Sequence, residues 1–425
     1  MIRIFDLGEL RREDVLRREG ALPDVREAVA RIIQDVRAQG DAALLRYAAQ
    51  FDGAGEAPLE VTPAEVEAAA KRVEPALLAI MREAAENIRA YHTKQVRGGF
   101  VITPKAGAVL GQIIRPLARV GVYVPGGTAC YPSTVLMDAL PAKIAGVEEI
   151  IMVTPAKGGV IRPEILAAAQ IAGVNRIFRT GGAQAVAALA YGTQTIPGVD
   201  KIVGPGNAFV AEAKRQVFGQ VDIDMIAGPS EILIVAEEGC EPKNIAADML
   251  AQAEHDVFAS AVLITPSRAL ALRVQAELER QLPLLTRAAI ARESIDNNGK
   301  ILLCGSVTEA ISLSNELAPE HLELCLQEPF ACLPLVQNAG SIFLGNHSPE
   351  ALGDYFAGPN HTLPTGGTAR FASPLSVDDF IKKSSFTYYT AQALGEVAAK
   401  VARFAQAEGL DAHAKSVTIR MEQEQ

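Results

Sequence analysis

Gln252 and His255 lie three positions apart in a segment that predicts a helix, so their side chains share one helical face. An amide oxygen and an imidazole nitrogen placed in this way can bind one metal ion. The spacing is common, and an ordinary polar helix face is the simpler interpretation of the pair alone. Three later segments favour a metal-binding or catalytic role for the pair instead. They are Pro319-Glu320-His321, Gly353-Asp354 with Asn360-His361, and Glu408 with Asp411-Ala412-His413.

Histidine is scarce in this chain, with six residues in all. We expect His92 to be a solvated residue of a charged helix and His347 to belong to an ordinary loop. The other four stand in compact polar motifs beside glycine, proline or carboxylate residues: His255, His321, His361 and His413.

Glu320 and His321 place a carboxylate beside an imidazole, which supplies two proton acceptors of different basicity. Pro319 biases Ala318 toward extended geometry, so we expect the pair at a boundary between elements. A histidine that caps a helix C-terminus is an equally good interpretation of the spacing. Asp354 is a candidate hard metal ligand, whereas a histidine in a tail, such as His413, is usually only solvated.

Composition bounds the class of protein. The chain has 425 residues, a net charge of −10 and a pI near 5.3, which argues against nucleic acid or an anionic membrane as the main partner. It contains neither an apolar run of membrane-spanning length nor a signal-peptide pattern, so we expect a cytoplasmic protein. Its five cysteines are odd in number and lack a C-x-x-C pair, which indicates reduced thiols.

The order of predicted elements indicates an α/β fold. Residues 24–95 predict helices and residues 110–124 predict extended chain. Strands and helices alternate over 120–236 and again over 242–344, which predicts parallel sheets with right-handed crossovers. From residue 376 we expect a helical tail.

Four glycine-rich loops each follow an apolar strand. Such loops gather at the carboxyl edge of an open parallel sheet, where a backbone can approach a phosphate. Turn geometry alone also explains any single loop. Together they favour a nucleotide or dinucleotide site, although neither G-x-G-x-x-G after a strand nor a P-loop occurs. The loops are Pro125-Gly126-Gly127-Thr128, Thr180-Gly181-Gly182-Ala183-Gln184, Gly204-Pro205-Gly206-Asn207 and Ala227-Gly228-Pro229-Ser230.

These motifs together resemble the histidinol dehydrogenase family over roughly residues 20–420. The resemblance covers Val122-Tyr123-Val124-Pro125-Gly126-Gly127, Gly204-Pro205-Gly206-Asn207, Ala227-Gly228-Pro229-Ser230-Glu231, Ala251-Gln252-Ala253-Glu254-His255, Pro319-Glu320-His321-Leu322, Gly353-Asp354-Tyr355, Asn360-His361-Thr362 and Ala412-His413, in family order.

The resemblance implies a role for each motif. One Zn²⁺ per subunit would be bound by Gln252, His255, Asp354 and His413, and the catalytic bases would be Glu320 and His321. NAD⁺ would contact Tyr123, Gln184 and Asn207. Substrate contacts would be Ser230, His361 and Glu408, together with His321 and the four zinc ligands.

The resemblance also implies an architecture. It consists of two Rossmann-like parallel-sheet domains of the aldehyde dehydrogenase type, with small helical extensions at both ends. The chain would form a homodimer with shared active sites, because the tail crosses to the partner. The expected divisions are an arm at 1–22, a catalytic domain at 23–122 with 232–375, an inserted NAD-binding domain at 123–231, and the tail at 376–425.

The implied reaction is the four-electron oxidation of L-histidinol to L-histidine through an enzyme-held aldehyde, with two NAD⁺, as the last step of histidine biosynthesis. His321 would accept the hydroxyl proton and Glu320 would activate water. A thiolate mechanism through Cys130 is the rival. A relative that oxidises another small polar alcohol and a zinc-stabilised scaffold protein are the competing functions.

Overall fold

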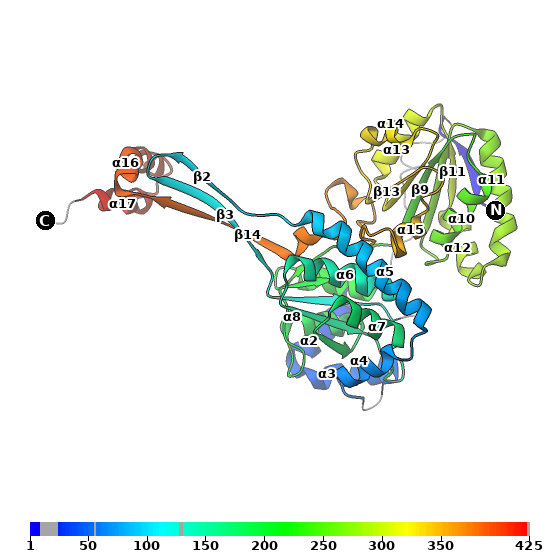
Figure 1. Cartoon of the computed structure of the whole chain (residues 1–425), viewed down its shortest axis with the longest axis horizontal. Coiled ribbons are helices and arrows are strands. Elements are labelled where there is room, and N and C mark those ends of the chain that lie inside the picture. The colour runs from blue at the N-terminus through cyan, green and yellow to red at the C-terminus, as the bar shows by residue number, and fades with distance from the viewer. Residues whose placement is uncertain (9–23, 55–56, 127–130, 423–425) are drawn as a thin grey trace. The chain divides into compact units, whose positions relative to one another are not determined.

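The computed structural model describes residues 1–8, 24–54, 57–126 and 131–422 (Figure 1). The chain divides into two compact units. The larger comprises Met1–Gln95 with Leu117–Phe380, and the smaller comprises Val96–Pro116 with Ile381–Gln425. Among the described helices, none combines the length and apolarity needed to cross a membrane.

The larger unit contains two parallel sheets, and the first has five strands in the order β6-β5-β4-β7-β8. The order reverses at β4, so the loops after β4 and β7 flank the crevice where open α/β sheets usually bind ligands. The strands are β4 (Arg119–Tyr123), β5 (Glu149–Thr154), β6 (Arg176–Arg179), β7 (Lys201–Val203) and β8 (Asp222–Ile223), and the connecting helices are α6 (Pro132–Ala145), α7 (Pro163–Ala172), α8 (Gly182–Tyr191) and α9 (Ala208–Val217).

The second sheet has six parallel strands in the order β1-β11-β10-β9-β12-β13. The predicted α/β class with two parallel sheets is therefore confirmed. The strands are β1 (Arg3–Asp6), β9 (Glu231–Ala236), β10 (Ser260–Thr265), β11 (Lys300–Leu303), β12 (His321–Cys325) and β13 (Ser341–Leu344). Its helices are α10 (Pro242–Ala253), α11 (Arg268–Gln281), α12 (Ala288–Asn298), α13 (Val307–Leu317), α14 (Pro329–Cys332) and α15 (Glu350–Tyr355).

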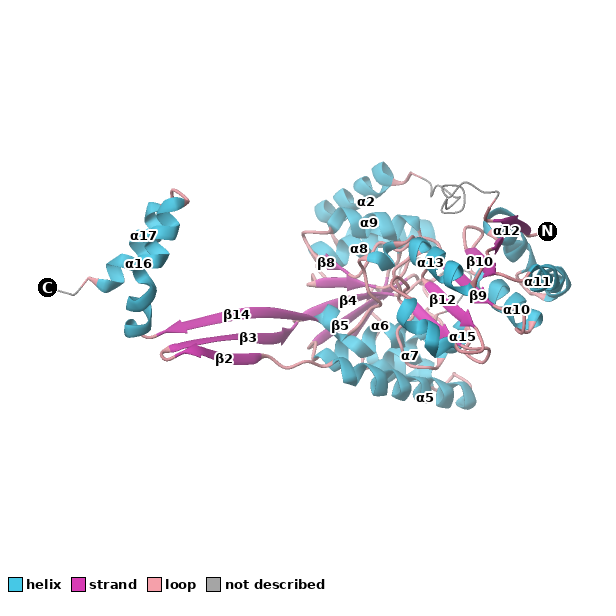
Figure 2. Cartoon of the chain, turned by 90° about the horizontal axis from the view of Figure 1, so that it is seen from above, coloured by secondary structure: helices cyan, strands magenta, loops and turns pink. Residues whose placement is uncertain are grey.

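The four N-terminal helices pack on the five-stranded sheet, and this differs from the expected division. Val29 of α2 shares a core with Tyr123 and Ile151, and Met81 of α5 shares one with Val120. Figure 2 shows α2 beside α8 and α9. The assignment of 23–122 to the catalytic domain is therefore wrong for these helices. An apolar stripe predicts that one face of a helix is covered, but it does not predict which sheet covers it. The helices are α2 (Arg26–Gln39), α3 (Asp41–Tyr47), α4 (Pro63–Ala70) and α5 (Pro75–His92).

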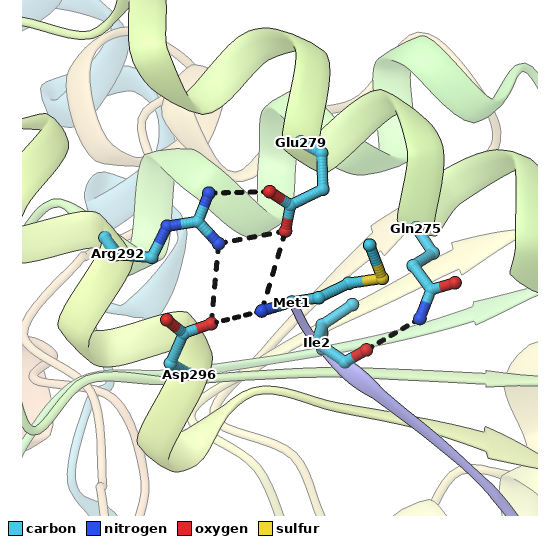
Figure 3. Close-up of polar contacts among 6 residues, drawn as sticks. All are labelled: Met1, Ile2, Gln275, Glu279, Arg292 and Asp296. Carbon is cyan, nitrogen blue, oxygen red and sulfur yellow. Dashed lines mark hydrogen bonds and ion pairs between the residues drawn. The ribbon is translucent and has the colours of Figure 1, made fainter.

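The N-terminal residues form part of the six-stranded sheet instead of a separate arm. Strand β1 pairs with β11, and the Ile2 carbonyl accepts a hydrogen bond from Gln275 at 2.8 Å. The amino group of Met1 forms ion pairs with Asp296 at 2.8 Å and with Glu279 at 3.8 Å (Figure 3). The rest of the expected arm, residues 9–23, lies outside the described residues.

The smaller unit joins a three-stranded antiparallel sheet to two helices. Its strands are ordered β14-β3-β2, and β14 pairs with β3 over its whole length. The expectation of an entirely helical tail is therefore wrong over β14, whose partner lies far away in sequence. The elements are β2 (Phe100–Lys105), β3 (Ala108–Pro116), β14 (Ile381–Tyr389), α16 (Ala391–Ala407) and α17 (Asp411–Thr418).

Candidate active site

The candidate site lies at the amino ends of β9 and β12. Strand β8 ends at Ile223 and β9 begins at Glu231. The intervening loop therefore leads from the carboxyl edge of the first sheet to the amino edge of the second. Within this loop Gly228 donates its N–H to Thr365 Oγ1 at 2.6 Å. All four glycine-rich motifs thus follow strands of the five-stranded sheet, as the sequence predicts.

Glu320 and His321 stand where the chain turns from α13 into β12. Ala318 ends the helix with φ 47° and ψ 63°, so the expected extended geometry there is wrong. It is the sole non-glycine residue with positive φ in the described chain. A left-handed residue costs energy and closes the helix abruptly. His321 is the first residue of β12, so it does not cap the helix.

Both side chains of the pair are buried and held by the backbone of one residue of β9, Glu231. Glu320 Oε2 accepts a hydrogen bond from Glu231 N at 2.8 Å, and His321 Nδ1 donates to Glu231 O at 3.1 Å. His321 Nε2 is thereby directed away from β9 and lies 3.8 Å from Asp354 Oδ1. The hydrogen bond on Nδ1 fixes the tautomer, which leaves Nε2 as the proton acceptor of a neutral ring.

The electrostatics of the pair suit proton transfer. Burial raises the pKa of Glu320 to about 7, although the neighbouring His321 opposes the shift. Burial lowers the pKa of His321, but the carboxylates of Glu350, Glu320 and Asp354 outweigh it and raise that pKa well above its usual range, which favours the protonated ring. A metal cation held beside Asp354 would offset these carboxylates and favour the neutral ring that accepts a proton at Nε2. A carboxyl group poised near neutral pH can act as a general base or acid.

A group of three metal-competent side chains lies beside His321. His255, Glu350 and Asp354 each offer one atom that can bind a metal, and these three atoms all lie within 4.8 Å of one another. Gln252 is fully buried. In the amide orientation that satisfies both of its ends, the nitrogen donates to Glu350 Oε2 at 2.8 Å and the oxygen accepts from Glu231 N at 3.0 Å. The structure thus brings together three of the four predicted zinc ligands. Imidazole, carboxylate and amide donors suit zinc.

Glu350 is the site residue that the sequence reasoning missed. It begins α15, is 2% exposed, and has its backbone N–H bound to Glu323 Oε1 at 2.8 Å. Its position after a proline resembles the ordinary acidic first turn of a helix. The available signal was its spacing from Asp354, because residues at i and i+4 share a helical face.

His361 lies on the far side of Asp354. Its Nδ1 donates to the Asp354 carbonyl at 3.0 Å, and its Nε2 lies 3.3 Å from Thr134 Oγ1. A cavity of about 260 Å³ includes His321, Asp354 and His361 in its lining, with Ile342, Phe343 and Leu363 among its apolar residues. The cavity can therefore receive a small ligand with both polar and apolar parts.

The predicted nucleotide contacts lie at the crevice of the five-stranded sheet. Tyr123 and Gln184 are only 4% and 2% exposed, and Tyr123 Oη accepts a hydrogen bond from Gly182 N at 3.0 Å. Asn207 is exposed, and its Oδ1 caps α9 by accepting from the N–H groups of Phe209 and Val210. The described geometry thus gives Tyr123 and Asn207 local structural roles and buries Gln184, and the contact of all three residues with NAD⁺ stays a prediction.

Glu408 and His413 belong to the smaller unit. Glu408 follows α16, His413 lies in α17, and both are exposed. Ser230 immediately precedes β9, is half-buried, and accepts a hydrogen bond at its carbonyl from Ser260 N at 3.0 Å. The other predicted site residues all belong to the larger unit.

Two further expectations concern residues outside the site. His92 is fully buried instead of solvated, and its Nδ1 lies 2.7 Å from Gln95 Oε1. Cys130, the rival nucleophile, lies outside the described residues. Burial raises the pKa values of Cys240, Cys304 and Cys325, which is the opposite of thiolate activation.

Comparison with known proteins decides the family. Residues 15–421 match the histidinol dehydrogenase family. The chain belongs to this family.

The family relationship extends over nearly the full chain. A histidinol dehydrogenase of Syntrophotalea carbinolica is 53% identical over 418 residues, which cover 98% of this chain and 97% of that protein. One of Bacillus thuringiensis is 56% identical over 401 residues, or 94% of each chain. The crystal structure of the Elizabethkingia anophelis histidinol dehydrogenase aligns with a TM-score of 0.94 at 36% identity and covers 99% of this chain and 98% of that one.

Proposed function

We propose that this protein is an NAD-dependent L-histidinol dehydrogenase. It would oxidise L-histidinol through L-histidinal to L-histidine, with two NAD⁺, as the last step of histidine biosynthesis in the cytoplasm. The observation that carries the proposal is the buried Glu320–His321 pair, whose His321 Nε2 lies 3.8 Å from Asp354 in the candidate metal group. Family membership supports the substrate.

His321 and Glu320 divide the proton transfers between the two oxidations. In the first, His321 Nε2 accepts the proton of the substrate hydroxyl while hydride leaves the same carbon. In the second, Glu320 accepts a proton from water, the water oxygen bonds to the aldehyde carbon, and the resulting diol loses hydride and protons to give the carboxylate. A buried carboxyl with a pKa near 7 and a fixed imidazole suit these two roles.

The imidazole, carboxylate and amide donors suit a zinc ion, and the crevice lies where open α/β sheets usually bind nucleotides. Gln252, His255, Asp354 and His413 would hold the zinc, which when bound would orient the substrate imidazole and amine. Tyr123, Gln184 and Asn207 would line the NAD⁺ site, and NAD⁺ when bound would accept hydride. Ser230, His361 and Glu408 would contact the substrate.

The protein would act as a homodimer in which the smaller unit completes the partner's site. This unit exposes large apolar side chains on its helices, including Phe404 at 71% and Ile419 at 50%. Such side chains indicate a surface that another protein covers. Glu408 and His413 would then serve the partner's site.

The test is NADH formation when purified protein is supplied with L-histidinol. We expect two NADH for each L-histidine formed, loss of activity after chelation, and recovery with zinc. NADH formation from another amino alcohol but not from L-histidinol would favour a relative that oxidises a different small polar alcohol. Zinc binding without NADH formation from any alcohol would favour a scaffold protein. Either result would overturn the proposed function.

A further inference from the structure

Helix α6 holds the segment that carries His361. Three hydrogen bonds connect residues of one helical face with three consecutive residues of that segment, and all the side chains except His361 are buried. The bonds join Asn360 Nδ2 to the Met137 carbonyl at 2.6 Å, Thr362 Oγ1 to Asp138 Oδ1 at 2.7 Å, and Thr134 Oγ1 to His361 Nε2 at 3.3 Å.

The second oxygen of Asp138 points to the glycine-rich loop after β7. Asp138 is fully buried, and its Oδ2 has no hydrogen-bond partner among the described residues. A Cβ placed on Gly204 would lie 3.0 Å from this oxygen and 2.1 Å from the Tyr123 carbonyl oxygen. Gly204 also has φ +113°, a backbone conformation that favours glycine. The loop therefore begins with a residue that must be glycine for two reasons, its φ and the close approach of Asp138 and Tyr123.

A buried ion pair fixes the same glycine from its other side. Lys214 and Asp224 are paired, with side chains only 2% and 1% exposed. Gly204 donates its N–H to Asp224 Oδ2 at 2.8 Å and accepts from Lys214 Nζ at 3.0 Å. A buried ion pair costs desolvation energy, and its use here is to hold the backbone that leads into Asn207.

The geometry points to Asp138 as a positioning residue that connects the loop beginning at Gly204 with the segment beginning at Asn360. We infer that this connection couples binding of the nicotinamide nucleotide to binding of the amino alcohol. The inference rests on the proposed function, which assigns Asn207 to the nucleotide and His361 to the substrate.

The physical basis is a shared rigid element between two sites. Gly204 is already held by the ion pair, so a nucleotide that restrains the rest of the loop at Asn207 would also restrain Asp138 and its bond to Thr362. The adjacent His361, whose Nδ1 is bonded to the Asp354 carbonyl, is then already placed for the substrate. Pre-organisation of this kind strengthens binding of the second ligand, and the coupling is reciprocal.

The experiment measures this coupling with a pair of ligands that cannot react. NADH is titrated into the zinc-loaded protein by nicotinamide fluorescence, with and without saturating L-histidinol. We expect L-histidinol to tighten NADH binding by roughly fivefold or more in the wild type. In Thr362→Val and Asp138→Leu the ratio should fall toward one. Asp138→Asn keeps the acceptor for Thr362 and should retain most of the coupling.

The matched control is Thr265→Val. Thr265 is also fully buried, and its hydroxyl accepts from Ser267 N at 3.1 Å at the end of β10. It should keep the wild-type ratio. If Asp138→Leu fails to fold, Thr362→Val and Asn360→Ala carry the test, because each removes one bond of the connection.

The outcomes separate the inference from the proposed function. A wild type that oxidises L-histidinol but has a coupling ratio of one overturns the inference alone. Folded Thr362→Val and Asp138→Leu proteins with the wild-type ratio do the same. A wild type that neither oxidises nor binds L-histidinol overturns both.

Discussion

Glu320 occupies a position where its protonation is balanced. The buried surroundings favour the neutral acid, whereas the N–H of Glu231 and the ring of His321 favour the carboxylate. His321 is held by the backbone carbonyl of the same residue, Glu231. One residue of β9 therefore sets the orientation of both groups, while their different surroundings set their protonation.

Glu320→Gln should impair aldehyde oxidation more than alcohol oxidation. The amide is nearly isosteric but cannot accept a proton from water, and loss of a general base typically costs about 10²- to 10⁴-fold. We expect a loss of this order on L-histidinal and less than about tenfold on the first hydride transfer from L-histidinol, followed in a single turnover. Exposed Glu328→Gln is the control. Equal losses in both half-reactions would contradict the water-activating role.

Asp138 should make stability fall as the pH rises. Burial raises its pKa to about 8, with Thr362 and Lys214 opposing the shift and Asp224 adding to it, whereas the unfolded pKa is about 3.9. Between these values the folded protein retains a proton that the unfolded chain has released. This contribution is fully present below about pH 4 and is lost by at most about 1.4 kcal/mol per pH unit up to pH 8.

Asp138→Asn removes that titration, so its unfolding free energy relative to wild type should increase from pH 5 to 8 and then level off. Urea unfolding at several pH values measures the difference. Exposed Glu293→Gln should follow the wild type throughout. A constant difference between Asp138→Asn and wild type would show that Asp138 ionises equally in both states.

Residue types identified most of the candidate site, but not its complete composition. His255, Glu320, His321 and Asp354 occur in recognisable polar motifs, and the structure gathers them. Glu350 was missed because a glutamate after proline is typical of any helix start. Asp138 lies in the apolar run of α6, where neither spacing nor residue type indicates its distant partners.

At the scale of elements, α15 brings the candidate metal group close to His321 through a close packing contact. A Cβ on Gly353 would lie 2.6 Å from the Phe343 ring, and that ring lies 6.1 Å from the His321 ring, centroid to centroid. Gly353 therefore lets α15 approach β13. The same approach brings Asp354 near His321.

Gly353→Ala should lower both stability and activity. Overpacking of this kind typically costs about 1–3 kcal/mol, and displacement of α15 should also weaken zinc binding through Asp354. Thermal unfolding, zinc content and turnover measure the three effects. Phe343→Leu should partly rescue them when combined with Gly353→Ala, because it removes the obstructing ring atoms. Full activity and zinc content in the single variant would show that α15 adapts freely.

Local patterns predicted the alternation of strands and helices over 120–236 and over 242–344, and the structure agrees. Local patterns failed where a segment far away in sequence determines the secondary structure or the packing. Strand β14 carries two lysines and two serines and depends on β3 for its hydrogen bonds. Similarly, the apolar faces of α2 and α5 did not indicate which sheet they cover.

At the scale of the whole molecule, the place of His413 in the smaller unit leads to a direct test. His413→Ala and His255→Ala proteins should each be inactive as homodimers. After subunit exchange, a heterodimer would carry both lesions in one site and neither in the other. Activity should therefore return to about half the wild-type value per heterodimer if one zinc site draws ligands from both chains.

Mass spectrometry verifies the exchange, and a mixture of His255→Ala with Gln252→Ala is the matched control. Both of these lesions belong to the larger unit, so each site of that heterodimer would still carry one of them. Exchange without recovered activity in the His413 mixture would show that the tail serves its own chain.

The pairing of β1 with β11 has a consequence for how the protein is made. Arg3 lies beside Lys300, so the first strand leaves the ribosome long before its partner. At typical synthesis speeds the delay is roughly fifteen seconds to a minute. All strands of the five-stranded sheet and its covering helices lie between them, so that sheet can form while β1 waits. We therefore expect stalled nascent chains whose residues up to 236 have left the ribosome to protect the first sheet from proteolysis while residues 1–8 remain cleavable.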